Sequence, residues 1–238
     1  MTDLFKSGYA SIVGRPNVGK STLLNCLMAK KVAVTSNRPQ TTRNKITGVL
    51  HLPGAQIILV DTPGIHQSDR TLNEMMVRAS VSTFSDVDLL LVMLSAESGF
   101  CVEDEFVLNS MRGVKTKKVL VINKVDLVDK SNLLILMDEM NQKSLFEEII
   151  PISALKEDGL DQLKNLILNY LPEGPEYFPK DMDTDCPETF LFGELIREKI
   201  LKLTRFEIPH SVAVVVEDMY EQNNGVVQID ATIYAEKD

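Results

Sequence analysis

The sequence GRPNVGKST, from Gly14 to Thr22, decides the fold. It follows an apolar run, Tyr9 to Val13, that predicts a β-strand, and the residues after it, LLNCLM, predict a helix. The spacing Gly-x-x-x-x-Gly-Lys-Ser between a strand and a helix is typical of a loop that binds phosphate. Its glycines let successive N–H groups converge on phosphate oxygens, and the helix N-terminus adds partial positive charge. We therefore expect an α/β protein that binds a phosphate group at this turn; a chance glycine-rich turn is the weaker alternative.

Two side chains of this loop are expected to meet the phosphates and their metal ion. The Lys20 ammonium would act as a point charge toward the β and γ phosphates of a nucleotide. The Ser21 hydroxyl would bind Mg²⁺, an ion that retains several waters and takes few protein ligands. The nucleotide-binding residues expected in this loop are Gly14, Asn17, Val18, Gly19, Lys20, Ser21 and Thr22.

Apolar runs alternate with amphipathic stretches through residues 1–171, the pattern of βα units around a mostly parallel sheet. The runs LLLVML and KVLVIN are near-continuous, as expected for strands covered on both faces. A helix is predicted over residues 160–171, where Pro172 ends it. The predicted fold class is α/β, a doubly wound mixed sheet with helices on both faces. The predicted strands are Tyr9–Val13, Ile46–Leu52, Gln56–Asp61, Val87–Leu94, Lys118–Ile122 and Glu148–Ile152.

A second motif, NKVD from Asn123 to Asp126, points to guanine as the base. It follows the apolar strand KVLVI, and ligands of open α/β sheets bind outside the carboxyl ends of the strands. The Asp126 carboxylate can accept hydrogen bonds from N1 and N2 of guanine, donors that adenine lacks. Asn123 can tie this loop to the phosphate loop, and the stem of Lys124 can cover the base. After the strand EIIPI, the pair Ser153 and Ala154 offers a backbone N–H to guanine O6.

A third motif, DTPG from Asp61 to Gly64, follows the strand QIILV. The Asp61 carboxylate is placed to hold Mg²⁺, usually through water, and the Gly64 amide can contact a γ-phosphate. The polar loop SNRPQTTRNK offers Thr41 or Thr42 as a further Mg²⁺ ligand, and we prefer Thr42. A loop that γ-phosphate orders and hydrolysis releases acts as a switch. The expected metal ligands are Ser21, Thr42 and Asp61, and the expected catalytic residues are Lys20, Thr42 and Gly64.

Composition indicates a soluble protein with one large domain and a smaller unit, because 238 residues exceed the usual single-domain length. Hydrophobic residues make up 44% of the chain and charged residues 25%, which suits a buried core. The three cysteines are too far apart to suggest a disulfide framework or a zinc site, and a reducing cytoplasm fits them best. The N-terminus lacks a signal sequence and no apolar run is long enough to span a membrane, so neither secretion nor membrane insertion is expected.

The net charge of −9 lies entirely in residues 172–238, which hold 6 Lys+Arg and 15 Asp+Glu. An acidic segment repels phosphate backbones, so composition alone argues against nucleic acid as the ligand of this part. Its first residues, PEGPEYFPKDMDTDCP, are rich in Pro and acids and predict a linker over residues 172–188. Beyond it, TFLFGELIREKILKLT predicts a helix, and SVAVVVEDMY and GVVQIDATIY predict two strands joined by the turn EQNNG.

The motifs GRPNVGKSTLLN, QTTR, DTPGIH, NKVD and ISAL, in this order and spacing, resemble those of the translation-factor-related GTPases, and most closely the Era family. The resemblance spans the whole chain. It implies a P-loop GTPase, with residues 1–171 as its GTP-binding domain, that binds GTP or GDP with Mg²⁺ and hydrolyses GTP as a switch in small-subunit ribosome assembly. The implied partners are the small ribosomal subunit and its 16S rRNA. A cytoplasmic monomer with peripheral contact to the inner membrane is expected.

In this family the segment after the linker is a KH domain, which grips RNA with a GxxG loop. The helix that contains ELIREKIL and the following hairpin resemble the first helix and first two strands of that domain. Residues 189–238 are therefore expected to be the N-terminal part of a KH domain. No GxxG follows Asp183, so full RNA binding is expected to need residues beyond this chain.

The residues after DTPG bear on hydrolysis. Many small GTPases orient the attacking water with a Gln just after this motif, but here Ile65 and His66 follow Gly64. Ile65 cannot hydrogen-bond water, so slow or assisted turnover is expected, and His66 is either a general base or a surface side chain. In related GTPases a phosphate-loop Asn holds a potassium ion, and Asn17 occupies that place. The alternative function is a GTP-binding scaffold or recruitment module with little intrinsic hydrolysis.

Overall fold

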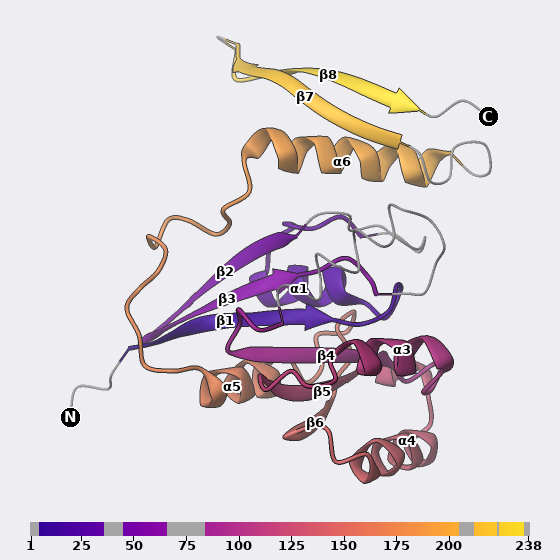
Figure 1. Cartoon of the computed structure of the whole chain (residues 1–238). Helices are drawn as coiled ribbons and strands as arrows, with labels where there is room; N and C mark the ends of the chain where they lie inside the picture. The colour runs from indigo at the N-terminus through magenta and orange to yellow at the C-terminus, as the bar shows by residue number, and fades with distance from the viewer. Residues whose placement is uncertain (1–4, 36–44, 66–83, 205–211, 223, 236–238) are drawn as a thin grey trace.

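The structure, a computed structural model, describes residues 5–35, 45–65, 84–204, 212–222 and 224–235. Six strands form one mixed sheet in the order β2-β3-β1-β4-β5-β6, and β7 and β8 form a separate hairpin (Figure 1). The strands are β1 (Lys6–Val13), β2 (Ile46–Leu52), β3 (Ala55–Asp61), β4 (Leu89–Ser95), β5 (Lys117–Asn123), β6 (Glu148–Pro151), β7 (Val212–Glu221) and β8 (Val227–Ala235). The helices are α1 (Lys20–Met28), α3 (Val102–Ser110), α4 (Lys130–Gln142), α5 (Leu160–Tyr170), α6 (Glu188–Leu203) and the short 3₁₀ helix η1 (Val125–Leu127).

The α/β fold class is confirmed. β2 pairs with β3 in antiparallel fashion, and every other pair in the six-stranded sheet is parallel. All six predicted strands of the sheet are present; β2 has the predicted bounds, and the other five differ at one or both ends. β1 begins at Lys6, three residues earlier than predicted, because Lys6 to Gly8 pair in register with Ala55 to Ile57 of β3. β4 runs from Leu89 to Ser95, where Ser95 lies opposite Asn123.

Helices cover both faces of the sheet (Figure 1). On one face, α1 and α5 pack against strand residues such as Ile57 and Leu91 in one buried cluster. On the other face, α3 and α4 pack against Leu90 and Leu120 in a second cluster. Every residue of β4 is buried, and β5 is buried from Val119 to Asn123, as their near-continuous apolar runs predicted for strands covered on both faces. Every residue of β3 is buried as well.

The segment between α5 and α6, residues 171–187, carries no helix or strand, yet it is fixed along the sheet; we call it the strap. Near its start, the backbone N–H of Ser7 donates to the carbonyl of Pro172 at 3.1 Å. In its middle, the Gln56 side chain accepts from the amides of Tyr177 and Phe178 at 2.9 and 3.1 Å. The strap is therefore held in place by backbone and side-chain groups of the sheet, although its composition predicted only a linker.

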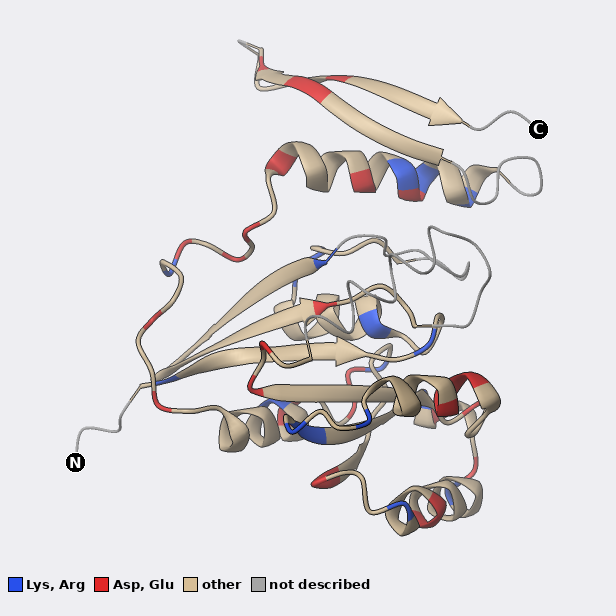
Figure 2. Cartoon of the chain, viewed as in Figure 1, with Lys and Arg blue, Asp and Glu red and all other residues tan. Residues whose placement is uncertain are grey.

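The end of the strap lies along β2. The carbonyl of Asp183 accepts from the Val49 N–H at 2.8 Å, and the Thr184 hydroxyl donates to the carbonyl of Thr47 at 2.6 Å. The Asp183 carboxylate also pairs with Lys30, at the end of α1. Acidic side chains recur along the strap and on α6 (Figure 2), in agreement with the charge distribution of the sequence.

The C-terminal unit, residues 188–235, consists of α6 and the β7–β8 hairpin, as predicted. α6 packs closely on the hairpin at Gly193, where an added Cβ would lie 3.2 Å from the carbonyl oxygen of Val214. The hairpin also exposes apolar side chains, among them Ile233 and Tyr234, which are 54% and 56% exposed. None of the described helices is long and apolar enough to cross a membrane.

An ion pair joins the C-terminal unit to the end of α1. Glu198 of α6 is 0% exposed, and its carboxylate lies 2.6 Å from the Lys31 ammonium. Lys202, one turn further along α6, pairs with the same carboxylate. Burial raises the pKa of Glu198, but the two lysines outweigh burial and hold that pKa below its ordinary value. The carboxylate is thus kept charged at the contact between the two units.

Candidate nucleotide-binding site

The predicted motifs meet at the carboxyl ends of the parallel strands. The phosphate loop follows β1, the DTPG motif follows β3, and the NKVD motif follows β5. These strands lie near one another in the order β3-β1-β4-β5, so loops far apart in the sequence converge at one edge. Such an edge is where open α/β sheets bind their ligands.

Close packing explains both glycines of the phosphate loop. Gly19 has φ +104°, a conformation that favours glycine, and an added Cβ would lie 2.3 Å from the amide nitrogen of Asn123. At Gly14 an added Cβ would lie 2.7 Å from the carbonyl oxygen of Met93. α1 begins directly after Gly19, so its unpaired N–H groups face the loop. The backbone therefore has the shape of an anion-binding turn.

Lys20 lies inside this turn. Its ammonium donates to the carbonyls of Gly14 and Arg15 at 3.0 and 2.9 Å, and the residue is 6% exposed. Burial lowers the pKa of Lys20 to about 8, partly offset by the nearby Asp61 carboxylate. A buried ammonium that has lost most of its water favours an anionic ligand.

Two of the predicted metal ligands lie side by side. The Ser21 hydroxyl donates to a carboxylate oxygen of Asp61 at 2.7 Å, and Asp61 is 0% exposed at the end of β3. A hydroxyl and a carboxylate next to a phosphate loop are the oxygen ligands that Mg²⁺ prefers, so this pair fits the ion. Thr62 is held by a hydrogen bond from its hydroxyl to the carbonyl of Ile12 at 2.9 Å. Thr41, Thr42 and His66 lie outside the described residues.

The base-binding motif is tied to the phosphate loop, as the sequence predicted. The Asn123 side chain donates from Nδ2 to the carbonyl of Val18 at 2.8 Å and accepts from the Ala154 N–H at 2.9 Å. This one amide therefore connects three loops: the phosphate loop, the NKVD loop and the loop after β6. Asn123 is 2% exposed, which suits a fixed connection.

Asp126 is oriented by a neighbouring hydroxyl. The Ser153 Oγ donates to one carboxylate oxygen of Asp126 at 2.6 Å. The backbone N–H of Ser153 donates to Asp158 at 3.0 Å, and that of Ala154 to Asn123. The predicted donation from this pair to guanine O6 stays a prediction, and the hydroxyl of Ser153 is a contribution that the sequence did not suggest.

A hollow of about 460 Å³ lies beside these groups. That volume is within the roughly 300–1,000 Å³ typical of small-molecule sites. Lys124, one of the residues that line this hollow, has a backbone φ of +64°. Its ammonium lies 2.9 Å from a carboxylate oxygen of Glu97. The residues that line the hollow include Asn17, Gly19, Thr22, Asn123, Lys124, Asp126 and Ser153, all predicted from the sequence.

The structure adds a network that the motifs did not predict. Arg15, inside the phosphate loop, donates from Nε to a carboxylate oxygen of Asp104 at 3.0 Å. Asp104 belongs to the first turn of α3, is 1% exposed, and accepts from the Cys101 N–H at 3.1 Å. Arg15 also donates to Ser98. The phosphate loop is thereby anchored to α3 on its outer side.

We expect Asp104→Asn to destabilise the protein by about 1–3 kcal/mol, because a buried charged acceptor is lost. Nucleotide affinity should fall only a few-fold, since the network supports the loop from outside. The matched control is Asp161→Asn, because Asp161 is 89% exposed and pairs with Lys164 on the surface. This control should change stability by less than about 0.5 kcal/mol. Urea unfolding of both variants measures the difference, and equal effects would contradict the anchoring role.

Gly64 and Ile65 fix the chain that follows Asp61. An added Cβ on Gly64 would lie 2.9 Å from the backbone nitrogen of Pro16, so this glycine touches the phosphate loop. The Ile65 N–H donates to the carbonyl of Gly14 at 3.1 Å. The Ile65 side chain is 0% exposed and belongs to the cluster under α3 and α4. Its role is packing, so it cannot orient a water molecule.

The chain is similar to known proteins that bind GTP, in agreement with the geometry of this site. Residues 9–124 match the family described as 50S ribosome-binding GTPase. The fold and the site thus define a P-loop GTPase.

Relatives extend the match to nearly the whole chain. GTPase Era of Lactobacillus helveticus is 49% identical over 234 residues, which is 98% of this chain and 77% of the relative. GTPase Era of Geotalea daltonii is 47% identical over 98% of this chain and 79% of the relative. The chain therefore belongs to the GTPase Era family.

Solved structures agree with that assignment. The crystal structure of Era in complex with MgGDPNP and nucleotides 1506–1542 of 16S ribosomal RNA is 40% identical, with a TM-score of 0.93 over 98% of this chain and 80% of that one. An Aquifex aeolicus Era variant bound to GDP and AlF4⁻ gives the same TM-score and identity.

Proposed function

We propose that this GTPase binds guanine nucleotides with Mg²⁺ and acts as a switch in the maturation of the small ribosomal subunit, with 16S rRNA as its partner. The strongest support is the fit to the Era structure that holds MgGDPNP and a 16S rRNA segment. The fit has a TM-score of 0.93 and covers 98% of the chain, so it includes the C-terminal unit as well as the nucleotide site. GTP, GDP and the rRNA segment are therefore the ligands to test first.

The phosphate loop is the proposed site for the β and γ phosphates. Backbone N–H groups from Gly14 to Thr22 would bind the phosphate oxygens, and the Lys20 ammonium would balance their charge. The Gly64 N–H, beside Pro16, would contact the γ-phosphate. Lys20 and Gly64 would act in catalysis by stabilising charge where it develops during transfer, which is the main contribution a protein makes to this reaction.

Ser21 and Asp61 are the proposed Mg²⁺ ligands, together with Thr42 from the loop after α1. Mg²⁺, when bound, supplies positive charge that offsets the charge of the phosphates. The 2.7 Å contact between Ser21 Oγ and Asp61 supports this assignment, because it places the two oxygens next to each other. Asp61 would act through a bound water, and Thr42 would bind only in the GTP state.

The base site is proposed at the hollow beside β5. The Asp126 carboxylate would accept from guanine N1 and N2, and the stem of Lys124 would cover the ring. Ser153 would hold the Asp126 carboxylate in the plane of the base, as its 2.6 Å hydrogen bond suggests. The pair Ser153 and Ala154 would offer a backbone N–H to guanine O6.

Intrinsic hydrolysis is proposed to be slow, because the buried Ile65 takes the place of a water-orienting glutamine. A second candidate function, a GTP-binding scaffold or recruitment module, rests on the same residue. Phosphate release from GTP, measured with and without the 3′-terminal 16S rRNA segment, separates the two. A switch enzyme should release phosphate faster than its Lys20→Met variant, whether or not the weakly bound RNA changes the rate. Phosphate release equal to that of the variant, with GTP still bound, would favour the scaffold.

Asn17 is the proposed ligand of a potassium ion near the phosphates. It is exposed, adopts φ +64°, and lines the nucleotide hollow. We expect GTP hydrolysis to be faster in potassium than in sodium buffer of equal ionic strength, because a fixed cation would add positive charge between the phosphates. Asn17→Ala should remove the difference while leaving GDP affinity within a few-fold. Equal rates of the unsubstituted protein in the two buffers would exclude the potassium site.

The proposed domain organisation follows the sequence: residues 1–171 bind GTP, residues 172–188 link, and residues 189–238 form the N-terminal part of a KH domain. The proposed location is the cytoplasm, with peripheral contact to the inner membrane, and the proposed state is a monomer. Filter binding of the 16S segment tests the KH assignment. Since residues 189–238 contain no GxxG, weak RNA binding is expected for this chain.

A further inference from the structure

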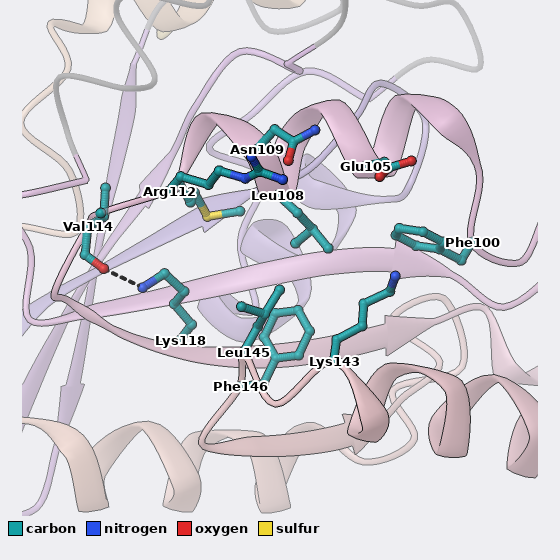
Figure 3. A pocket seen from close by; sticks show the side chains of 12 residues that line it. Phe100, Glu105, Leu108, Asn109, Arg112, Val114, Lys118, Lys143, Leu145 and Phe146 are labelled. Atoms are coloured by element: carbon teal, nitrogen blue, oxygen red, sulfur yellow. Dashed lines mark hydrogen bonds between the residues drawn. The ribbon is translucent and has the colours of Figure 1, made fainter.

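A second hollow lies between α3 and the loop that joins α4 to β6 (Figure 3). Its volume is about 460 Å³, and it shares no lining residue with the nucleotide hollow. The proposed function uses none of its side chains. Its size suits a small organic molecule.

The centre of this hollow is apolar. Leu108 extends from α3 toward Leu145 and Phe146 of the opposite loop, and Phe100 stands at one end (Figure 3). Leu108, Phe146 and Phe100 are only partly buried, and Leu145 is 51% exposed. Apolar side chains that face a shared concavity favour a ligand with an apolar body, because its burial removes that surface from water.

Three cations surround the apolar centre: Arg112, Lys118 and Lys143. In the part of the chain that the structure describes, none of the three pairs with a carboxylate. Other cations do find acidic partners there, as Arg15 does with Asp104. The Lys143 ammonium instead lies 4.2 Å from the centre of the Phe100 ring. Among the residues that line the hollow there is one carboxylate, Glu105.

The Lys118 ammonium has one N–H donor more than its two hydrogen bonds within the protein use. This group donates to the carbonyls of Val114 and Thr116 at 2.6 and 3.0 Å. An ammonium has three N–H donors, so these two acceptors leave one for a ligand. Burial lowers the pKa of Lys118, although Glu147 partly counteracts this effect. An anion beside Lys118 would replace the solvation that burial removes.

We propose that this hollow binds a small organic anion with an apolar body, such as an aromatic or medium-chain carboxylate or sulfonate. The apolar part would lie between Leu108 and Phe146, and the anionic group would accept from Lys118 or Lys143. Inorganic phosphate alone would bind poorly because it leaves the apolar centre exposed to water. The site is separate from nucleotide binding and does not depend on the proposed function.

The test uses the fluorescence of 8-anilinonaphthalene-1-sulfonate, an anion with an apolar body, titrated into the full chain. Leu145→Asp places a carboxylate at the mouth of the hollow, and we expect it to weaken binding about fivefold or more. The matched control is Leu134→Asp, since Leu134 is 65% exposed on α4 and outside the hollow. The control should leave the affinity unchanged. Octanoate should compete with the probe, whereas octanol and inorganic phosphate should not.

Two further variants make the test independent of folding. Glu105→Gln removes the one carboxylate that lines the hollow and should tighten binding by about two- to fivefold. Lys143→Gln should weaken it by a similar factor. GDP affinity, measured with a fluorescent nucleotide, should stay the same in all four variants and reports that each one is folded. Equal affinities for Leu145→Asp and Leu134→Asp, or no change with Glu105→Gln and Lys143→Gln, would overturn the proposal.

Discussion

Gly19→Ala is expected to weaken GDP binding by at least about 100-fold. The new Cβ would stand 2.3 Å from the Asn123 amide nitrogen, and no side chain can occupy that distance. Asn123 would have to move away from the Val18 carbonyl, which it now contacts at 2.8 Å. The phosphate loop and the base loop would then separate, so phosphate and guanine could no longer be held together.

A control substitution at Gly54 distinguishes the two ways in which Gly19→Ala could act, backbone strain and steric contact with Asn123. Gly54, in the β2–β3 turn, has φ +74°, but an added Cβ there meets nothing within 4 Å. Gly54→Ala should therefore cost only the strain of a left-handed residue, about 1–3 kcal/mol of stability, and leave GDP affinity unchanged. Titration with a fluorescent GDP analogue and thermal unfolding measure the two quantities. If both alanine variants bind GDP alike, the contact with Asn123 is not what requires glycine at position 19.

Asp126→Asn is expected to change the base that the site prefers. Asparagine presents one oxygen and one N–H₂ group, so it cannot accept from both N1 and N2 of guanine. Two hydrogen bonds to a charged acceptor are worth about 1.5–3 kcal/mol each, so GDP affinity should fall by about 100-fold or more. Xanthine carries a carbonyl where guanine has its amino group, and the new N–H₂ can donate to it. Xanthosine diphosphate should therefore bind the variant better than GDP does.

Ser153→Ala is a milder substitution that tests the same contact with the base. It keeps the Asp126 carboxylate and removes only the hydroxyl that donates to it at 2.6 Å. GDP affinity should fall by a few-fold and guanine should remain preferred over xanthine, because the carboxylate that accepts from the base is retained. Competition between the two diphosphates measures preference directly. A guanine preference that survives Asp126→Asn would show that other groups read the base.

The sequence predicted the sheet and the nucleotide site because both depend on local patterns. Apolar runs mark the buried strands, and the phosphate loop is complete within nine residues, Gly14 to Thr22. The convergence of Asn123 with this loop followed from a general property of parallel sheets rather than from either motif alone. Strand ends were less accurate, since Lys6 to Gly8 become strand through pairing with β3, which no local pattern reveals.

Contacts between distant side chains could not be predicted in this way. In the sequence Asp104 is one of three consecutive acids, and nothing in that pattern points to Arg15, yet the structure buries Asp104 against Arg15, 89 positions earlier. The strap gives a second example. Its prolines and acids correctly predicted an absence of helix and strand, but its fixation depends on Gln56, a polar residue that is 0% exposed in the middle of the sheet. The composition of a segment indicates whether it forms a helix or strand, but it does not indicate which residues elsewhere in the chain form hydrogen bonds with it.

The strap has a consequence for how the protein can meet other chains. β2 is an outer strand of the six-stranded sheet, and such strands can recruit a further strand from another molecule. The strap occupies two backbone groups of β2, because Thr184 donates to the Thr47 carbonyl and the Val49 N–H donates to the Asp183 carbonyl. At the opposite side, β6 is only four residues long and ends at Pro151, which has no N–H to offer. The strap thus protects part of the β2 edge against the addition of a strand from another molecule.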